Sequence, residues 1–100
     1  MIEITVDKCR ISVKGHAGQA PMGRDVACAG ASVLLYALAE TLEEHREDMI
    51  SLDIRLNSGD GYVSAEPKEH FEEFTSAVFE MTVNGYSQLQ QLFSDFVKIN

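Results

Sequence analysis

The order in which hydrophobic periodicity changes along this chain constrains its fold more than any other feature of the sequence. Apolar and polar residues alternate in four short stretches, which is the pattern of half-buried strands. Two longer stretches are apolar throughout or repeat apolar residues every three or four positions, which is typical of helices. The strand-like stretches cover residues 2–6, 9–13, 50–56 and 62–66, and the helical stretches cover 26–44 and 71–96. The order β-β-α-β-β-α predicts an α+β fold, a two-layer sandwich in which one antiparallel sheet carries two helices.

The junctions between these stretches carry turn signals. Asp7–Lys8 would join the first two strands as a hairpin, and the Ser-Gly-Asp-Gly sequence of residues 58–61 would join the second pair. Residues 26–35 are apolar or small on every side, which predicts a central helix that is buried all round. Asn84–Gly85 is a candidate break in the second helix. No linker or internal repeat divides the chain, so residues 1–100 are predicted to form a single domain.

Composition excludes several classes of protein. Sixteen acidic residues against eight basic ones give a net charge of −8, which argues against direct binding of nucleic acid and favours a basic protein or peptide as partner. The first residues lack the basic and apolar regions of a signal peptide, and no run of about 18 apolar residues is present, so no membrane partner is expected. Two cysteines cannot form a disulfide framework. We therefore expect a cytoplasmic protein.

Chemistry is most plausible where the glycine-rich segment 15–23 leads into the first helix. Asp25 is a good N-cap residue, which would place Cys28 near the third helical position. Unpaired N–H groups and the positive end of the helix dipole would favour a thiolate there and could stabilise an oxyanion. If the fold brought His16 close, it would complete a Cys–His pair of the nucleophilic type.

A structural interpretation competes with this one, because a cysteine in an apolar helix is usually a small core residue. Cys9 lies in a strand pattern and is expected to be a buried, inert thiol. His45 and His70 lie in acidic surroundings and are expected on the solvated surface. The cysteines and histidines show none of the short paired spacings of a zinc site, so no metal is expected.

The residues of this junction resemble the signature of the ribosomal-processing cysteine proteases of bacteria. The resemblance rests on the separation of twelve between histidine and cysteine and covers essentially the whole chain. It is carried by Gly15-His16-Ala17, Gly23, Asp25 and Cys28-Ala29-Gly30-Ala31-Ser32. It implies a homodimeric endopeptidase that removes the N-terminal extension of large-subunit ribosomal protein twenty-seven, cutting next to aromatic residues.

The resemblance also implies roles for individual residues. His16 matches the catalytic histidine and Cys28 the nucleophile, while Asp25 and Ser32 match supporting positions. Gly15 and Gly23 match hinge positions of the loop that covers the active site. Residues 18–22 lack the tyrosine that many relatives carry there.

The sequence thus supports a hypothesis and one alternative. In the hypothesis, the Cys28 thiolate attacks the scissile carbonyl, His16 acts as general base and acid, and no cofactor is needed. The alternative is a non-catalytic ribosome-assembly module that binds a basic ribosomal-protein peptide. The joint presence of His16 and Cys28 favours the enzyme, since a binding module would not need both.

Overall fold

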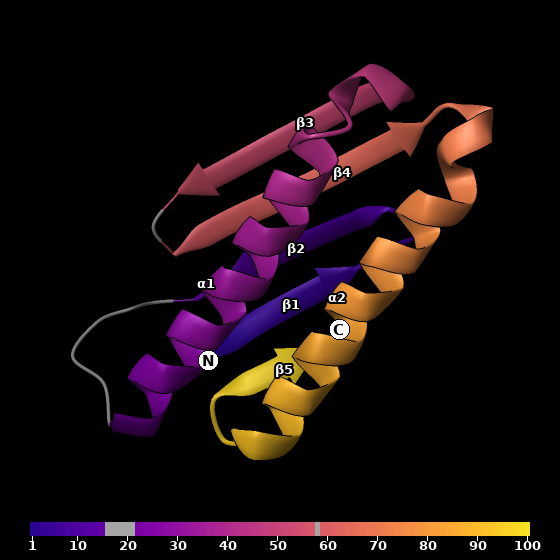
Figure 1. The fold of residues 1–100 in the computed structure, drawn as a ribbon. Helices are drawn as coiled ribbons and strands as arrows, with labels where there is room; N and C mark the ends of the chain where they lie inside the picture. The colour runs from indigo at the N-terminus through magenta and orange to yellow at the C-terminus, as the bar shows by residue number, and fades with distance from the viewer. Residues whose placement is uncertain (16–21, 58) are drawn as a thin grey trace.

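A computed structural model describes the backbone of residues 1–15, 22–57 and 59–100, and the side chains of these residues except 22–25. Two helices cover one face of a five-stranded sheet with strand order β3-β4-β2-β1-β5 (Figure 1). Short 3-10 turns, η1 (Arg46–Asp48) and η2 (Glu69–Phe71), precede β3 and α2. The strands are β1 (Ile2–Val6), β2 (Arg10–Lys14), β3 (Met49–Asn57), β4 (Asp60–Pro67) and β5 (Val97–Ile99), and the helices are α1 (Met22–Glu43) and α2 (Glu72–Leu92).

The two-layer α+β architecture and the order of the first six elements agree with the prediction from periodicity. The sheet is mixed, however, because β5 pairs parallel to β1, with Ile2 opposite Val97 and Ile4 opposite Ile99. Residues 93–96 belong to the return from α2 to this strand, and the Ile2 amide donates a hydrogen bond to the Phe96 carbonyl at 2.7 Å. The expectation of a purely antiparallel sheet and of a helix to residue 96 was therefore wrong.

The predicted break at Asn84–Gly85 is absent, since α2 runs without interruption from Glu72 to Leu92. Gly85 instead allows α1 to approach α2 closely. A Cβ on Gly85 would lie 2.7 Å from Leu34 Cδ2, and a Cβ on Gly30 would lie 2.8 Å from Leu89 Cδ1. The two glycines therefore serve packing between the helices rather than chain reversal.

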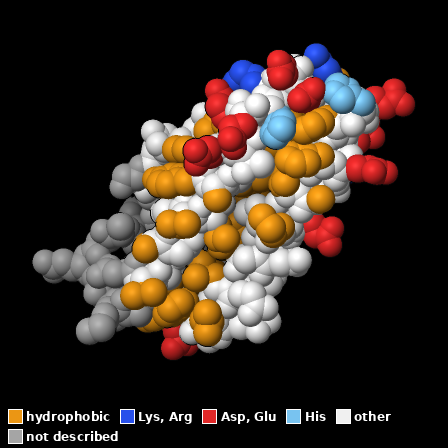
Figure 2. Space-filling view, viewed as in Figure 1, with side chains coloured by type: hydrophobic (Ala, Val, Ile, Leu, Met, Phe, Trp, Pro, Cys, Tyr) orange, Lys and Arg blue, Asp and Glu red, His pale blue; other side chains and the backbone are white. Residues whose placement is uncertain are grey.

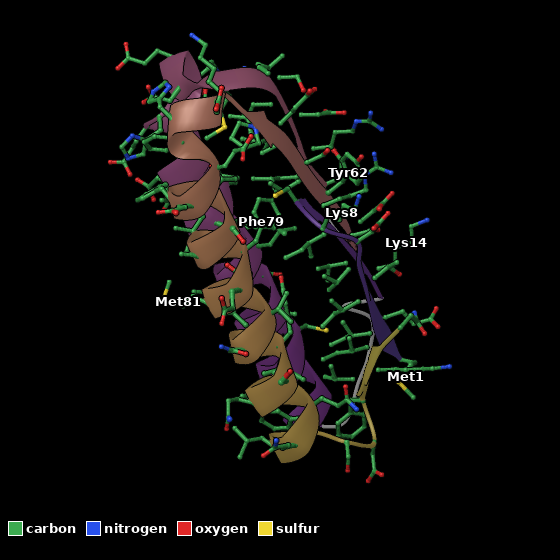
Figure 3. The ribbon with its side chains drawn as sticks, turned by 90° about the vertical axis from the view of Figure 1, so that its right-hand side faces the viewer. Met1, Lys8, Lys14, Tyr62, Phe79 and Met81 are labelled. Carbon is green, nitrogen blue, oxygen red and sulfur yellow. The ribbon has the colours of Figure 1, made fainter. Side chains whose placement is uncertain are left out.

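Helix α1 is not buried all round, contrary to the prediction. Its inner face supplies much of the core, including Ala27, Ala31 and Leu35. Val26 and Val33 face outward and are 55% and 63% exposed. The reason is architectural: in a two-layer sandwich the sheet and α2 cover only part of the helix surface. Figure 3 shows the two layers from the side, with Phe79 between them.

The hydropathy of α1 is relevant to the prediction that no segment of the chain spans a membrane. Residues Val26–Glu43 have a mean hydropathy of 1.4 and are long and apolar enough to cross a membrane by length and composition alone. The segment is not an uninterrupted apolar run, because it contains Ser32, Glu40, Thr41 and Glu43. A core helix of a soluble protein passes the same test, and a third of this segment is buried inside the structure, so the observation is weak support for a membrane span.

Tyr86 joins the two helices through its buried hydroxyl group. The side chain is fully buried, and its hydroxyl donates a hydrogen bond to the Ala31 carbonyl at 3.0 Å. Removing the hydroxyl leaves that carbonyl without this donor, so we expect Tyr86→Phe to lower the free energy of unfolding by about 1 kcal/mol near pH 7. Urea denaturation of the two proteins measures the difference.

Burial also raises the pKa of Tyr86 well above its ordinary value of 10.0, so the folded protein keeps this phenol neutral. The unfolded chain ionises it near pH 10, and stability should therefore hold below that pH and fall as the pH rises beyond it. Tyr86→Phe should show a weaker loss between pH 10 and 11. An equal loss in both proteins would contradict the assignment.

Candidate active site

A small cavity lies where α1, the end of β2 and the turn between β3 and β4 meet. Its volume is about 60 Å³. Helix α1 contributes Cys28 and Ser32, the end of β2 contributes Gly15, and the β3–β4 turn contributes Asn57 and Asp60. The structure thus places the predicted nucleophile and one predicted supporting residue on the same cavity wall, one helical turn apart.

The position of Cys28 within α1 differs from the prediction. The helix begins at Met22, so Asp25 lies in its first turn and is not the N-cap, and Cys28 is the seventh helical residue. Aspartate favours the first turn as well as the cap because both lie at the positive end of the helix dipole, so the sequence signal did not separate them. The start of the helix is about 9 Å along the axis from Cys28.

This shift changes the chemistry that the helix can supply. The influence of the dipole falls off within the first turn, and the N–H groups without intrahelical partners belong to the first four residues. Cys28 lies beyond both. The helix terminus is therefore not placed to stabilise a Cys28 thiolate or an oxyanion.

His16 lies outside the described residues, as do Ala17 and the rest of the segment to residue 21. Its neighbour Gly15 is described and is held tightly. The Gly15 amide donates a hydrogen bond to the Gly59 carbonyl at 3.1 Å, and a Cβ on Gly15 would lie 3.0 Å from Ile2 Cα. The residue that precedes His16 in the chain is thus anchored at the Cys28 cavity. Gly23, which was placed in the loop, lies in the first turn of α1.

The β3–β4 turn, which the sequence predicts as a hairpin turn, also forms a wall of the cavity. Gly59 adopts a φ of +75°, which favours glycine, and a Cβ on Gly61 would clash with the Leu35 side chain. These glycines bring Asn57 and Asp60 to the cavity. No local pattern could have revealed this, because the turn is about thirty residues from Cys28 in sequence and meets it only in the fold.

The remaining cysteine and histidines lie elsewhere. Cys9 is in the turn before β2 rather than in the strand, is half-buried, and burial raises the pKa of its thiol. His70 Nε2 lies 2.9 Å from Asp48 Oδ1, and the ring centroid of His45 lies 4.9 Å from that of Phe71. Within the described part of the chain, no group of three or more His, Cys, Asp or Glu side chains is placed to hold a metal ion.

Comparison with known proteins gives the same assignment over the whole chain. A family model described as cysteine protease Prp matches residues 1–98. None of the curated proteins compared with the chain matches it.

Solved structures share the fold. The ribosomal processing protease Prp from S. aureus in complex with a substrate peptide has a TM-score of 0.76 at 16% identity, covering 99% of this chain and 95% of that one. A protein from Streptococcus mutans has a TM-score of 0.75 at 26% identity, covering 100% and 92%. Because the family model spans nearly every residue and the cavity holds Cys28, the chain belongs to the cysteine protease Prp family and is a cysteine peptidase.

Proposed function

We propose that this peptidase removes the N-terminal extension of large-subunit ribosomal protein twenty-seven during ribosome maturation. The observation that carries the proposal is the Cys28 cavity with Gly15, the residue before His16, on its wall. The similarity in fold to a ribosomal processing protease bound to a substrate peptide supports the substrate class.

In the proposed mechanism the Cys28 thiolate attacks the scissile carbonyl carbon and forms a tetrahedral intermediate. His16 accepts the thiol proton and donates it to the leaving amine, after which water releases the acyl group from sulfur. Since Cys28 lies beyond the helix terminus, His16 is the group that promotes the thiolate. Asp25 lies inside α1 and is not its N-cap, so we propose the other role considered for it, which is to orient His16. We also propose that Gly15 and Gly23 act as hinges, as the family resemblance implies.

The net charge of the chain and the cellular location that we propose are both consistent with this substrate. The net charge of −8 attracts basic polypeptides such as ribosomal proteins over long range. The acidic side chains gather where α1 ends and α2 begins, at the end of α1 that is far from Cys28 (Figure 2). We propose that the peptidase acts in the cytoplasm, where ribosomes mature.

We also propose that the peptidase acts as a homodimer. Apolar side chains lie along the outer face of the helix layer (Figure 2). Val26 and Val33 of α1 and Leu92 of α2 are 55%, 63% and 74% exposed. A second copy of the chain that packed on this face would cover these side chains. Analytical ultracentrifugation tests the dimer separately from the activity.

The test of the function is direct. The purified protein is incubated with the precursor of ribosomal protein twenty-seven from the same organism, and the product is sized by mass spectrometry. We expect cleavage at one bond next to an aromatic residue, and no cleavage of a precursor whose extension has been scrambled. An intact precursor after long incubation would contradict the proposal.

Replacing Ser32 tests whether a polar side chain on the cavity wall contributes to catalysis. Its side chain is exposed on α1 and lines the cavity with Cys28. Because alanine is a better helix former than serine, Ser32→Ala should not lower stability. We propose that the Ser32 hydroxyl hydrogen-bonds the bound substrate, and loss of this bond should lower kcat/KM roughly tenfold. Ser76→Ala, at an exposed serine of α2 away from this cavity, is the matched control and should leave kcat/KM unchanged.

A further inference from the structure

Strand β3 forms one edge of the sheet and pairs with β4 on one side only. In an antiparallel pair, successive residues direct their backbone groups alternately toward the partner and away from it. The outer edge of β3 therefore presents a row of backbone N–H and C=O groups. Within the residues that the structure describes, no strand pairs with this row.

The inner side chains of β3 form an apolar ledge beside this edge. The register places Leu52, Ile54 and Leu56 opposite Ala65, Val63 and Gly61, which face the helix layer. We call Leu52, Ile54 and Leu56 the β3 ledge. Leu52 and Ile54 are only half-buried and Leu56 is 40% exposed, because β3 is the edge strand of the sheet.

The β3 side chains on the face of the sheet away from the helices do not prevent another chain from pairing with the β3 edge. Natural sheet edges are commonly protected by proline, by unpaired charge or by a bulge. Strand β3 contains neither proline nor lysine. The Arg55 side chain donates two hydrogen bonds to the Asp53 carboxylate, at 2.6 and 3.2 Å, so the two charges compensate each other. The irregularity between Met49 and Ser51 confines the regular edge to residues 51–57.

This edge leads into the Cys28 cavity. Asn57 is the last residue of β3, and it lines the cavity together with Cys28 and Ser32. An extended chain hydrogen-bonded along residues 51–57 would therefore lead to the cavity that Cys28 lines. Substrate is favoured over a second protein copy as occupant because only a polypeptide that must reach Cys28 gains from this continuity.

We propose that the outer edge of β3 binds the substrate polypeptide as an added strand, with every second substrate side chain on the β3 ledge and the scissile bond at the Cys28 cavity. This inference rests on the proposed function and specifies its substrate further. The preferred substrate is an extended segment with apolar residues at alternate positions. Backbone hydrogen bonds then supply affinity, and the ledge supplies specificity.

The decisive experiment modifies the peptide rather than the protein. Synthetic peptides that span the extension are made with one N-methylated amide at each position in turn, and their Kd for the Cys28→Ser protein is measured by fluorescence anisotropy. Methylation of an amide that bonds to β3 removes the donor, whereas methylation of the next amide does not. We expect Kd to rise at least tenfold at alternate positions only, and a scan without alternation would overturn the inference.

Hydrogen exchange locates the bound peptide independently of activity. We expect binding to slow exchange of alternate β3 amides between residues 51 and 57, and to leave β5, the opposite edge of the sheet, unchanged. Protection of β3 that depends on protein concentration without peptide would assign the edge to a second copy and overturn the proposal.

Matched charge variants test the ledge. Leu56→Asp should raise KM for the extension peptide at least tenfold. Met81→Asp, with its dimer content checked by ultracentrifugation, should leave KM unchanged, because Met81 is 70% exposed on α2 and points away from the sheet, on the side of the proposed dimer face (Figure 3). If the peptide is cleaved and Leu56→Asp has a normal KM, the inference fails while the proposed function stands. If the unmodified peptide is neither bound nor cleaved, the proposed function fails and the inference falls with it.

Discussion

Replacing Cys28 by serine is expected to abolish cleavage of the extension while leaving the fold intact. Serine has nearly the same size, and Cys28 is half-buried on α1, so the replacement removes no large packing contact. A hydroxyl group is far less acidic than a thiol, and the family to which the chain belongs uses a cysteine nucleophile. We expect kcat to fall by at least about 10³-fold.

Cys9→Ser is the matched control. Cys9 lies in the turn between β1 and β2 and does not line the Cys28 cavity, so this variant should keep its activity. Circular dichroism and thermal unfolding establish that both variants are folded, and mass spectrometry of the digested extension peptide measures cleavage. Substantial cleavage by the Cys28→Ser protein would remove Cys28 from the role of nucleophile.

Local patterns predicted most of the fold. The alternation in residues 2–6 and 50–56 comes from strands with one face on the core, and this is the information that periodicity contains. Strand β5 was not predicted, because three residues are too few to show a period. Its existence depends on parallel pairing with β1 at the other end of the chain. Gly85 was misread because a glycine signals a break locally, whereas here it makes room for Leu34 of another helix.

Part of the candidate site, too, can be predicted from local sequence, whereas another part depends on the fold. Cys28 and Ser32 are four residues apart on one helix, so their common face follows from helical geometry. Asn57 and Asp60 reach the cavity only because the β3–β4 hairpin packs beside α1. The start of α1 was placed too late because residues 21–25 satisfy the sequence preferences of both a cap and a first turn. That difference of four residues removes the helix terminus as the source of thiolate stabilisation at Cys28.

The last prediction follows from the position of Cys28 beyond the helix terminus. Cys28 should react with iodoacetamide at least tenfold faster than Cys9 at pH 7, because the pKa of Cys9 is raised by burial and Cys9 is not in the cavity. The mechanism proposed for His16 also predicts that alkylation of Cys28 persists below pH 8, where an ordinary thiol is mostly protonated. Peptide mapping by mass spectrometry gives the rate for each cysteine.

His16→Ala should shift the pH profile of Cys28 alkylation to more alkaline pH, and the shift should be large because the helix terminus lies about 9 Å along the axis and cannot substitute for the histidine. His45→Ala is the matched control, since His45 packs on Phe71 and Phe74 and does not line the cavity. The extension peptide is included in a parallel series, so that slow access to the thiol is distinguished from low reactivity. A Cys28 that reacts as slowly as Cys9 at every pH, with and without peptide, would contradict the activation of Cys28 by His16 and the mechanism built on it.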